Sequence, residues 1–373
     1  MLIGTEPPEW GFEKERALEV AARVVTAKGY EVFNAEHGPN GRDPKIFHGP
    51  EHLVRMKARG LKLAKVFRLS KVRQLILEGN FAWHDAVIDY TPADSNNLLA
   101  RITRRRGARK GDNQKDPEMI GNEGKSAQAQ KEEMLATKIF SKNQIETSEW
   151  ANWATYPEVE MGSDYQGVPF SEYPFLTQIL EQSPALGAFL EELKTQGVEK
   201  GSLFSQPYLE KPLEQGKKVP REVLITALAD LGASGMDEKE TFFLEGDAEM
   251  RELYGNLRKP EVFGRLVNGD SVTDQSDREK VSQAFLKWLK DQASFATWQY
   301  LRFEKIVFLL KRSKQLNSRE EKDFRDLFSH YEKNIRSALR RFQEVGGEVE
   351  RIKKTNGEKA AFKYLAKEVG YNF

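Results

Sequence analysis

The sequence predicts an α+β protein, in which a small N-terminal α/β unit is followed by a mainly helical C-terminal two-thirds. Three observations predict this class. Short apolar runs with strand-like alternation lie in the first hundred residues. Helix start and stop signals dominate after Trp150. Residues 105–145 contain few large apolar side chains and separate the two parts of a 373-residue chain, which is long enough for two or three domains.

The N-terminal unit, residues 1–104, is expected to combine helices with strands. Apolar residues recur at helical spacing from Phe12 to Lys28, and Gly29 is predicted to end that helix before the apolar run YEVFNA. The stretch LKLAKVFRL alternates apolar and basic residues, as a strand with one buried face does. The expected elements are helices over 12–28, 51–59 and 70–77 and strands over 30–35, 61–69 and 81–90.

Residues 105–145 predict a flexible polar insertion or linker, because their small and polar side chains cannot offset the entropy cost of ordering the chain. Helices are predicted after it. Pro184 and Pro220 each open a helical pattern that a glycine follows. Capping-box spacings at Ser276 and Ser318 predict two more helix starts, and Gly346 with Gly347 is predicted to end the last of these helices.

The net charge of +1 hides a basic, acidic, basic layout. Basic residues outnumber acidic residues by 14 to 5 over 51–110 and by 23 to 17 over 261–373. Acidic residues outnumber basic residues by 21 to 11 over 141–260. The chain therefore divides into a basic unit (1–104), the linker (105–145), an acidic, mainly helical region (146–270) and a basic helical region (271–373). This asymmetry predicts a charged partner. The alternative is that the acidic middle folds against the basic flanks, so that the charges cancel within the protein.

Several protein classes are disfavoured by composition. The chain has no cysteine, which excludes disulfides, thiolate zinc sites and cysteine nucleophiles. No run approaches the roughly 18 apolar residues of a membrane helix, and residues 1–8 lack the basic start and apolar block of a signal peptide. We therefore expect a cytoplasmic protein without membrane contact. No GxGxxG, P-loop or GxSxG motif occurs, so the sequence implies no cofactor.

The strongest functional signal is a set of cations over residues 55–110. Glu51 is the only acidic residue between 51 and 75, whereas an ordinary solvated face mixes both signs. Cations on one side of the unit can neutralise phosphates and release condensed counterions. The predicted nucleic-acid-binding residues are Arg55, Lys57, Arg59, Lys62, Lys65, Arg68, Lys71, Arg73, Arg101, Arg104, Arg105, Arg106, Arg109 and Lys110.

A second basic block lies beside the apolar helix stripes of the C-terminal region. Its cations are Lys311, Arg312, Lys314, Arg336, Arg340, Arg341, Arg351, Lys353, Lys354, Lys359, Lys363 and Lys367. Aromatic residues are interleaved at helical spacing, and this spacing is more typical of a core than of a base-stacking platform. They are Trp288, Phe295, Trp298, Tyr300 and Phe303.

Histidines and carboxylates give little indication of a metal site. His48 and His52, with His37 nearby in the sequence, form no HExxH pattern, and we interpret them as loop histidines. Asp85 and Asp89 would share one face of a strand, where they could bind a metal or face solvent. The aspartates of GDSVTDQSD lack calcium-loop spacing, and a helix cap at residues 276–277 explains them better.

Residues 12–43 resemble the entry to a restriction-endonuclease-like core. In those nucleases a helix that bears a glutamate precedes a strand, and an aspartate then begins the metal site. Glu15 or Glu19, the run YEVF and Asp43 would fill these places. The resemblance implies that the carboxylates hold Mg²⁺, which polarises a phosphate and activates water. The next strand should carry an acidic residue and a lysine two apart, whereas LKLAKVF offers only the lysines.

The charge pattern predicts a non-enzymatic nucleic-acid-binding protein. We expect it to be a subunit of a larger nucleoprotein complex, of the replication, mobile-element or RNA-guided defence type, with DNA or RNA and other protein subunits as partners. One alternative is a Mg²⁺-dependent nuclease built on Glu19 and Asp43. The other is a protein–protein scaffold with segregated charge, which predicts no salt-sensitive affinity for nucleic acid.

Overall fold

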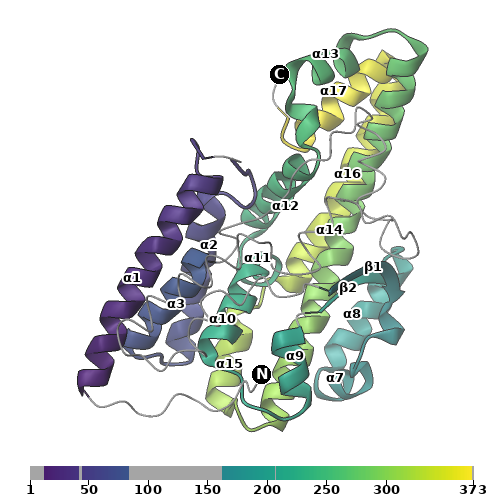
Figure 1. Cartoon of the computed structure of the whole chain (residues 1–373). Helices are drawn as coiled ribbons and strands as arrows, with labels where there is room; N and C mark the ends of the chain where they lie inside the picture. Colours follow the sequence, from purple (N-terminus) through teal and green to yellow (C-terminus); the bar gives the residue numbers. More distant parts are fainter. Residues whose placement is uncertain (1–11, 42–43, 84–161, 206, 372–373) are drawn as a thin grey trace, which may run out of the picture.

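The computed structural model describes residues 12–41, 44–83, 162–205 and 207–371, and this part of the chain is mainly helical (Figure 1). The predicted α+β class with an N-terminal α/β unit is therefore wrong. The described residues of the N-terminal unit form three helices, α1 (Phe12–His37), α2 (Pro50–Val66) and α3 (Lys71–Trp83). In the described ranges the strands are β1 (Gly162–Pro169) and β2 (Lys200–Ser205), which form one antiparallel pair.

The predicted strand over 30–35 lies inside α1. Ala22, Gly29 and Phe33 are all buried and follow one another at helical spacing, so Gly29 lies on the packed face of the helix and not at its end. This face packs against α3 (Figure 1). Sequence alone does not show whether a small residue allows close packing or a turn, so the stop predicted at Gly29 is wrong.

The predicted strand over 61–69 falls mostly in the C-terminal half of α2. The buried face of this helix includes Arg59 and Gly60 as well as Met56 and Leu63, so its apolar period is interrupted in the sequence. A nine-residue window then shows alternation where the whole helix has a repeat of about 3.6 residues. Residues 81–83 of the third predicted strand belong to α3, and its remainder lies outside the described residues.

The 41-residue helix α14 (Val272–Arg312) is the long axis of the C-terminal part, with a length of about 60 Å at 1.5 Å per residue. Helix α16 (Tyr331–Asn356) runs back along it, and β2, α7, α9 and α17 also pack on it (Figure 1). The other elements are η3 (Phe170–Glu172), α7 (Leu176–Gln182), α8 (Pro184–Thr195), α9 (Pro207–Glu214), α10 (Arg221–Asp230), α11 (Ala233–Met236), α12 (Lys239–Leu253), η4 (Gly255–Arg258), α13 (Pro260–Asn268), α15 (Ser318–Leu327) and α17 (Glu358–Glu368).

Proline marked helix starts correctly, whereas the predicted capping boxes were misplaced. Helix α8 begins at Pro184, and Pro220 is the N-cap residue of α10. The actual capping boxes pair Ser271 with Asp274 at the start of α14 and Asn317 with Glu320 at the start of α15. Several acidic and hydroxyl residues near each start share the required spacing of three, so the spacing alone does not select the pair.

The predicted end of the last amphipathic helix at Gly346 and Gly347 is also wrong. Helix α16 continues through both glycines to Asn356, and the following Gly357 has a left-handed φ of 83°. Val345 and Val349 are buried on either side of the glycine pair. The apolar face of the helix therefore continues past two residues of poor helix propensity, and packing outweighs propensity.

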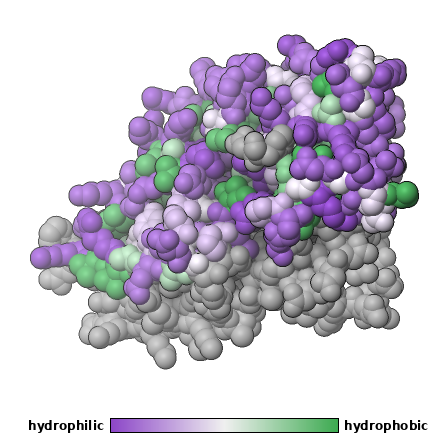
Figure 2. Space-filling view, turned by 90° about the horizontal axis from the view of Figure 1, so that it is seen from above, coloured by the Kyte–Doolittle hydropathy of each residue, from purple (hydrophilic) through white to green (hydrophobic). Residues whose placement is uncertain are grey.

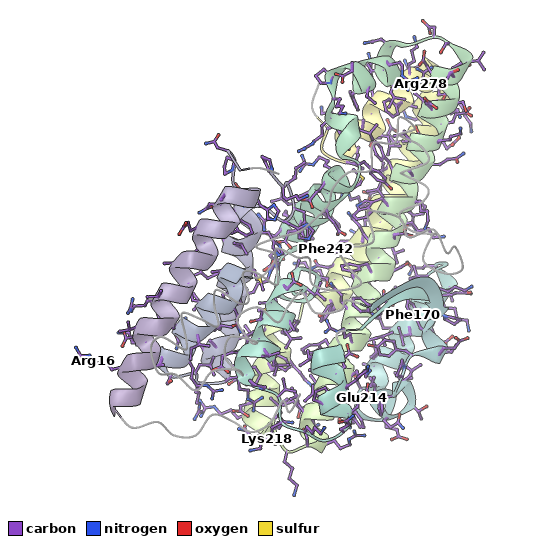
Figure 3. All side chains as sticks on the ribbon, viewed as in Figure 1. Arg16, Phe170, Glu214, Lys218, Phe242 and Arg278 are labelled. Atoms are coloured by element: carbon purple, nitrogen blue, oxygen red, sulfur yellow. The ribbon has the colours of Figure 1, made fainter. Side chains whose placement is uncertain are left out.

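Two hydrophobic clusters share the α14–α16 helix pair. The larger cluster joins the N-terminal unit to α10 and to the C-terminal half of α14, and it includes Leu63, Phe81, Leu224 and Ile306. The smaller cluster surrounds the N-terminal part of α14 together with α13 and α17. Figure 3 shows Arg278 beside this smaller cluster, at the end of the molecule opposite Lys218.

The surface is mostly hydrophilic when it is viewed from the upper end of Figure 1, and apolar side chains form small separate groups on it (Figure 2). None of the described helices has the length and apolar content that a membrane span requires. The exposed large apolar residues of the described ranges are Val20, Val24, Val54, Leu61, Leu244, Val272 and Phe295.

Gly60 allows α2 and α3 to approach closely. A Cβ atom at this position would lie 2.0 Å from Phe81 Cζ, in the buried core. We expect Gly60→Ala to lower the free energy of unfolding in urea by about 2–3 kcal/mol through overpacking. Gly346→Ala is the matched control, since no atom lies within 4 Å of its Cβ position, and it should raise that free energy by about 0.5–1 kcal/mol. Equal effects of the two substitutions would contradict the packing described here.

Candidate functional site

The eight cations predicted between residues 55 and 73 divide into two groups. Four of them form ion pairs inside the protein, and these are Arg55, Lys57, Arg59 and Arg73. The other four are exposed, and these are Lys62, Lys65, Arg68 and Lys71, which we call the exposed α2–α3 cations. Only the second group combines an exposed side chain with the absence of an ion pair in the described ranges.

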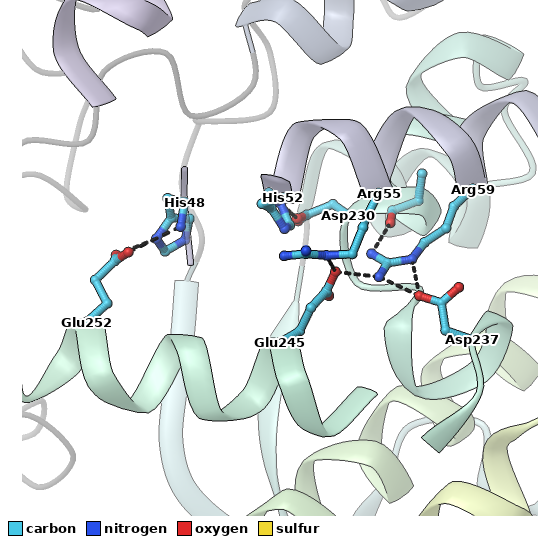
Figure 4. A network of polar contacts seen from close by, with 9 residues as sticks. His48, His52, Arg55, Arg59, Asp230, Asp237, Glu245 and Glu252 are labelled. Atoms are coloured by element: carbon cyan, nitrogen blue, oxygen red, sulfur yellow. Dashed lines mark hydrogen bonds and ion pairs between the residues drawn. The ribbon is translucent and has the colours of Figure 1, made fainter. Parts of the chain in front are cut away.

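Arg59 is the most deeply buried member of the first group, with 1% of its side chain exposed. Its Nε donates to Asp237 Oδ2 over 2.8 Å, and its Nη2 donates to Glu245 Oε1 over 2.6 Å (Figure 4). Arg55 Nε donates to the same Glu245 oxygen over 2.5 Å. Burial by itself would lower the pKa of Arg59, but the two carboxylates outweigh it and raise the pKa above its ordinary value.

Glu252 lies two turns beyond Glu245 on α12 and binds the segment before α2. Its Oε2 accepts hydrogen bonds from the backbone N–H groups of Ile46, Phe47 and His48 at 2.8–3.1 Å. Its Oε1 lies 2.6 Å from His48 Nδ1 (Figure 4). Burial raises the pKa of Glu252, but the charge of His48 and these hydrogen bonds outweigh it and hold the pKa well below its ordinary range.

Two further pairs of charged or titratable side chains lie at the junction between the N-terminal unit and the acidic middle. His52 Nε2 lies 3.2 Å from Asp230 Oδ1. Arg73 binds the buried carboxylate of Glu222 through Nε and Nη2, at 2.6 and 2.9 Å. All these acidic partners belong to the stretch 141–260. The alternative interpretation, in which the acidic middle folds against the basic flank, is therefore confirmed for this junction.

The exposed α2–α3 cations lie along the end of α2 and the start of α3. In the chain, no acidic residue occurs between Glu51 and Glu78. Arg68 has a left-handed φ of 51° and occupies the turn that ends α2. There its N–H donates to Lys65 O, and the next N–H, of Leu69, donates to Ala64 O. This is a Schellman motif, in which glycine is the usual left-handed residue.

The C-terminal basic block is partly neutralised in the same way. Arg341 pairs with Asp247 and Arg336 pairs with Glu192, both across to the acidic middle. The block retains exposed cations that form no ion pair within the described ranges, namely Lys314, Arg340, Lys353, Lys354, Lys363 and Lys367. The interleaved aromatics lie mainly in the core, as predicted, with Trp288, Trp298 and Phe303 buried and Phe295 38% exposed.

The structure does not support the resemblance of residues 12–43 to a nuclease core. The run YEVF is part of α1 and not a strand, and Glu19 on the same helix pairs with Arg23 at 2.8 Å. Asp43 lies outside the described residues. Within the part of the chain that the structure describes, no three His, Asp or Glu side chains are grouped so that they could hold a metal ion.

The remaining candidate ligands have structural partners or lie outside the described ranges. The carboxylate of Asp274 accepts from the Ser271 backbone and hydroxyl in the α14 cap, and Asp277 pairs with Arg265 at 2.8 Å. The ring of His37 packs edge-on against Phe33. Predicted residues outside the described ranges are Asp85, Asp89, Arg101, Arg104, Arg105, Arg106, Arg109 and Lys110.

Sequence reasoning missed two exposed cations, Lys217 and Lys218, in the segment before α10. Their charge does not stand out because they lie within 141–260, where acidic residues dominate. The local signal is the adjacent pair itself, between Gly216 and Pro220, in a segment that lacks regular structure.

No protein-family model matches the chain, and no curated protein or solved structure matches it either. The functional interpretation therefore rests on the charges and contacts of the described residues alone.

The burial of Arg59 predicts a large and specific loss of stability when it is removed. Arg59→Met removes the buried cation beside Asp237 and leaves Glu245 with Arg55 alone, and we expect the free energy of unfolding to fall by about 3–5 kcal/mol. Lys62→Met on the exposed side of the same helix is the matched control, with an expected change within about 0.5 kcal/mol. Urea denaturation measures both. A similar small effect of both substitutions would show that the ion pairs do not hold α2 in place.

The lowered pKa of Glu252 predicts that its contribution to stability depends on pH. Its folded pKa is below the ordinary value of 4.5, so its stabilisation is present above that value and is lost as the pH falls through the folded pKa. At pH 7 we expect Glu252→Gln to lower the free energy of unfolding by about 2–3 kcal/mol. The difference from wild type should shrink progressively below pH 4.5. Glu344→Gln on the exposed face of α16 is the control, and a pH-independent effect of Glu252→Gln would contradict the assignment.

Proposed function

We propose that this protein binds nucleic acid through its phosphates, at the exposed α2–α3 cations. One observation carries the proposal. Internal ion pairs take up four of the eight cations between residues 55 and 73. Lys62 and Lys65 near the end of α2, Arg68 in the turn after it and Lys71 at the start of α3 remain exposed, without an ion-paired carboxylate in the described ranges. When lysine and arginine side chains contact phosphates, counterions condensed on the nucleic acid are released, and this release favours binding.

The surroundings of these cations are more typical of a phosphate-binding surface than of an ordinary solvent-exposed surface. Ordinary charged surfaces alternate both signs, as the exposed pair of Lys322 with Asp326 does. Lys71 acts on Glu19, but the pKa of Glu19 is lowered mainly by its hydrogen bond from Arg23 and to a smaller extent by Lys71. Membership of a larger nucleoprotein complex stays a prediction.

The test is a salt series of fluorescence-anisotropy titrations with labelled DNA and RNA. It compares wild type with K62A/K65A/R68A/K71A and with the matched control K353A/K354A/K363A/K367A, which removes four exposed cations at the other end of the chain. We expect the first variant to bind at least about tenfold more weakly at low salt, and its salt slope to fall by up to about 4, at roughly 0.9 per lost phosphate contact. The control should stay within about twofold of wild type.

Two outcomes would contradict the proposal. Equal losses in both variants would indicate general attraction to net charge, and absence of wild-type binding at low salt would favour the scaffold alternative. The variant R104A/R105A/R106A/R109A tests the predicted arginine run separately in the same assay, since those residues lie outside the described ranges.

A further inference from the structure

Three chain segments meet beside the exposed α2–α3 cations. They are the α2–α3 connection (67–70), the segment before α10 (216–220) and the α14–α15 connection (313–317). Arg221 links two of them, because its guanidinium lies 4.5 Å from the centre of the Phe67 ring and its Nη2 donates to Gln315 O. We call these three segments together the loop cluster.

The side chain of Gln315 links the α14–α15 connection to the segment before α10. Its Oε1 accepts from the Val219 N–H over 3.1 Å, and its Nε2 donates to Lys217 O over 3.1 Å. The loop cluster is thus held together by contacts from each of its segments. Figure 3 shows Lys218 at this end of the molecule, with its side chain pointing away from the helices.

Each segment of the loop cluster carries an exposed cation. These are Arg68, Lys217, Lys218 and Lys314, none of which forms an ion pair within the described residues. The acidic residues next to them in the sequence are already used, since Glu214 pairs with Lys305 at 2.8 Å and Glu320 forms the α15 capping box. The cations are therefore not neutralised locally.

Two of these cations occupy left-handed backbone positions. Arg68 has a φ of 51° and Lys314 has a φ of 56°, and Phe175 is the one other non-glycine residue of the described ranges with a positive φ. Each cation ends its helix in a Schellman motif, with hydrogen bonds from Leu69 N to Ala64 O and from Gln315 N to Leu310 O. Glycine would relieve the strain at both positions, so the charge is kept at a conformational cost.

Cations near a helix C-terminus also interact favourably with the helix dipole, and this is the competing explanation. It accounts for a positive charge in the last turn, which Lys65 and Lys311 already supply. It does not account for cations one residue beyond the cap, where the Schellman hydrogen bonds already satisfy two of the last carbonyl groups of each helix. The ends of these two side chains are left for solvent or for a partner.

We propose that Lys217, Lys218 and Lys314 extend the exposed α2–α3 cations into one surface for the phosphate backbone of duplex nucleic acid. This inference rests on the proposed function and adds its extent and its ligand class. The loop cluster places cations from three separate segments on a scaffold held by Arg221 and Gln315, which suits the fixed phosphate positions of a duplex.

The aromatic residues nearby favour a duplex over a single strand. Proteins that bind single strands stack bases on exposed aromatic rings. Beside the loop cluster, Phe67 and Phe324 are buried and in contact with each other, at a ring-centre distance of 5.6 Å. Among the described residues, Phe295 is the one exposed aromatic, and it lies in the middle of α14. Phosphate contacts without base contacts also imply binding that is independent of sequence.

The first test compares K217A/K218A/K314A with K353A/K363A/K367A, which removes three exposed cations elsewhere. With a labelled 20-base-pair duplex at low salt, we expect about a fivefold or larger loss for the first variant and less than about twofold for the control. Wild type should bind the duplex more tightly than either of its separated strands. If the first variant binds like wild type while K62A/K65A/R68A/K71A is weakened, the extension is wrong and the proposed function stands.

The second test uses the left-handed positions. Arg68→Gly and Lys314→Gly should each raise the midpoint of thermal unfolding, because glycine accepts a positive φ, while each weakens duplex binding. Opposite changes in stability and affinity separate a binding role from a structural one, and a fall in both would overturn the inference. Polyglutamate that displaces the duplex at equal charge concentration would also overturn it, since the surface would then serve an acidic protein.

Discussion

The ion pairs of Arg59 set the position of the N-terminal unit. A guanidinium that is 1% exposed is stable only beside counter-charges, and Asp237 at the end of α11 and Glu245 in the middle of α12 supply them. Helix α2 can therefore dock in one register against these helices. On the other side of the acidic middle, Glu210 of α9 binds Arg302 and Lys305 of α14, at 2.8 Å each. The acidic region thus lies between two basic ones and binds both.

The same interactions explain how much of the fold the sequence could predict. The basic, acidic, basic layout and the proline-marked starts of α8 and α10 were readable, because they depend on composition and on local backbone chemistry. The starts of the three N-terminal helices were readable too, but their ends were not, because Arg59, Gly60 and Gly29 occupy core-facing positions where periodicity analysis expects apolar side chains. A buried, paired arginine and a close-packed glycine have no signal of their own in a single sequence.

The candidate site, too, could be predicted only in part from the sequence. Arg55, Arg59 and Arg73 resemble Lys62, Lys65 and Arg68 in charge and spacing along the chain, and nothing local distinguishes the two groups. The difference is made by carboxylates such as Glu222 and Glu245, which lie about 150 to 190 residues further along the chain. Sequence therefore located the basic region, and the fold decides which of its cations remain available to a ligand.

The 41 residues of α14 also determine how the protein unfolds. Both hydrophobic clusters are built on the same two helices, with α14 and α16 contributing side chains to each. Melting either cluster would expose an apolar stripe on helices that the other cluster still holds in place, and that exposure is unfavourable. The two clusters are therefore coupled through continuous backbone, and we infer that the described helices behave as one cooperative unit with a single transition.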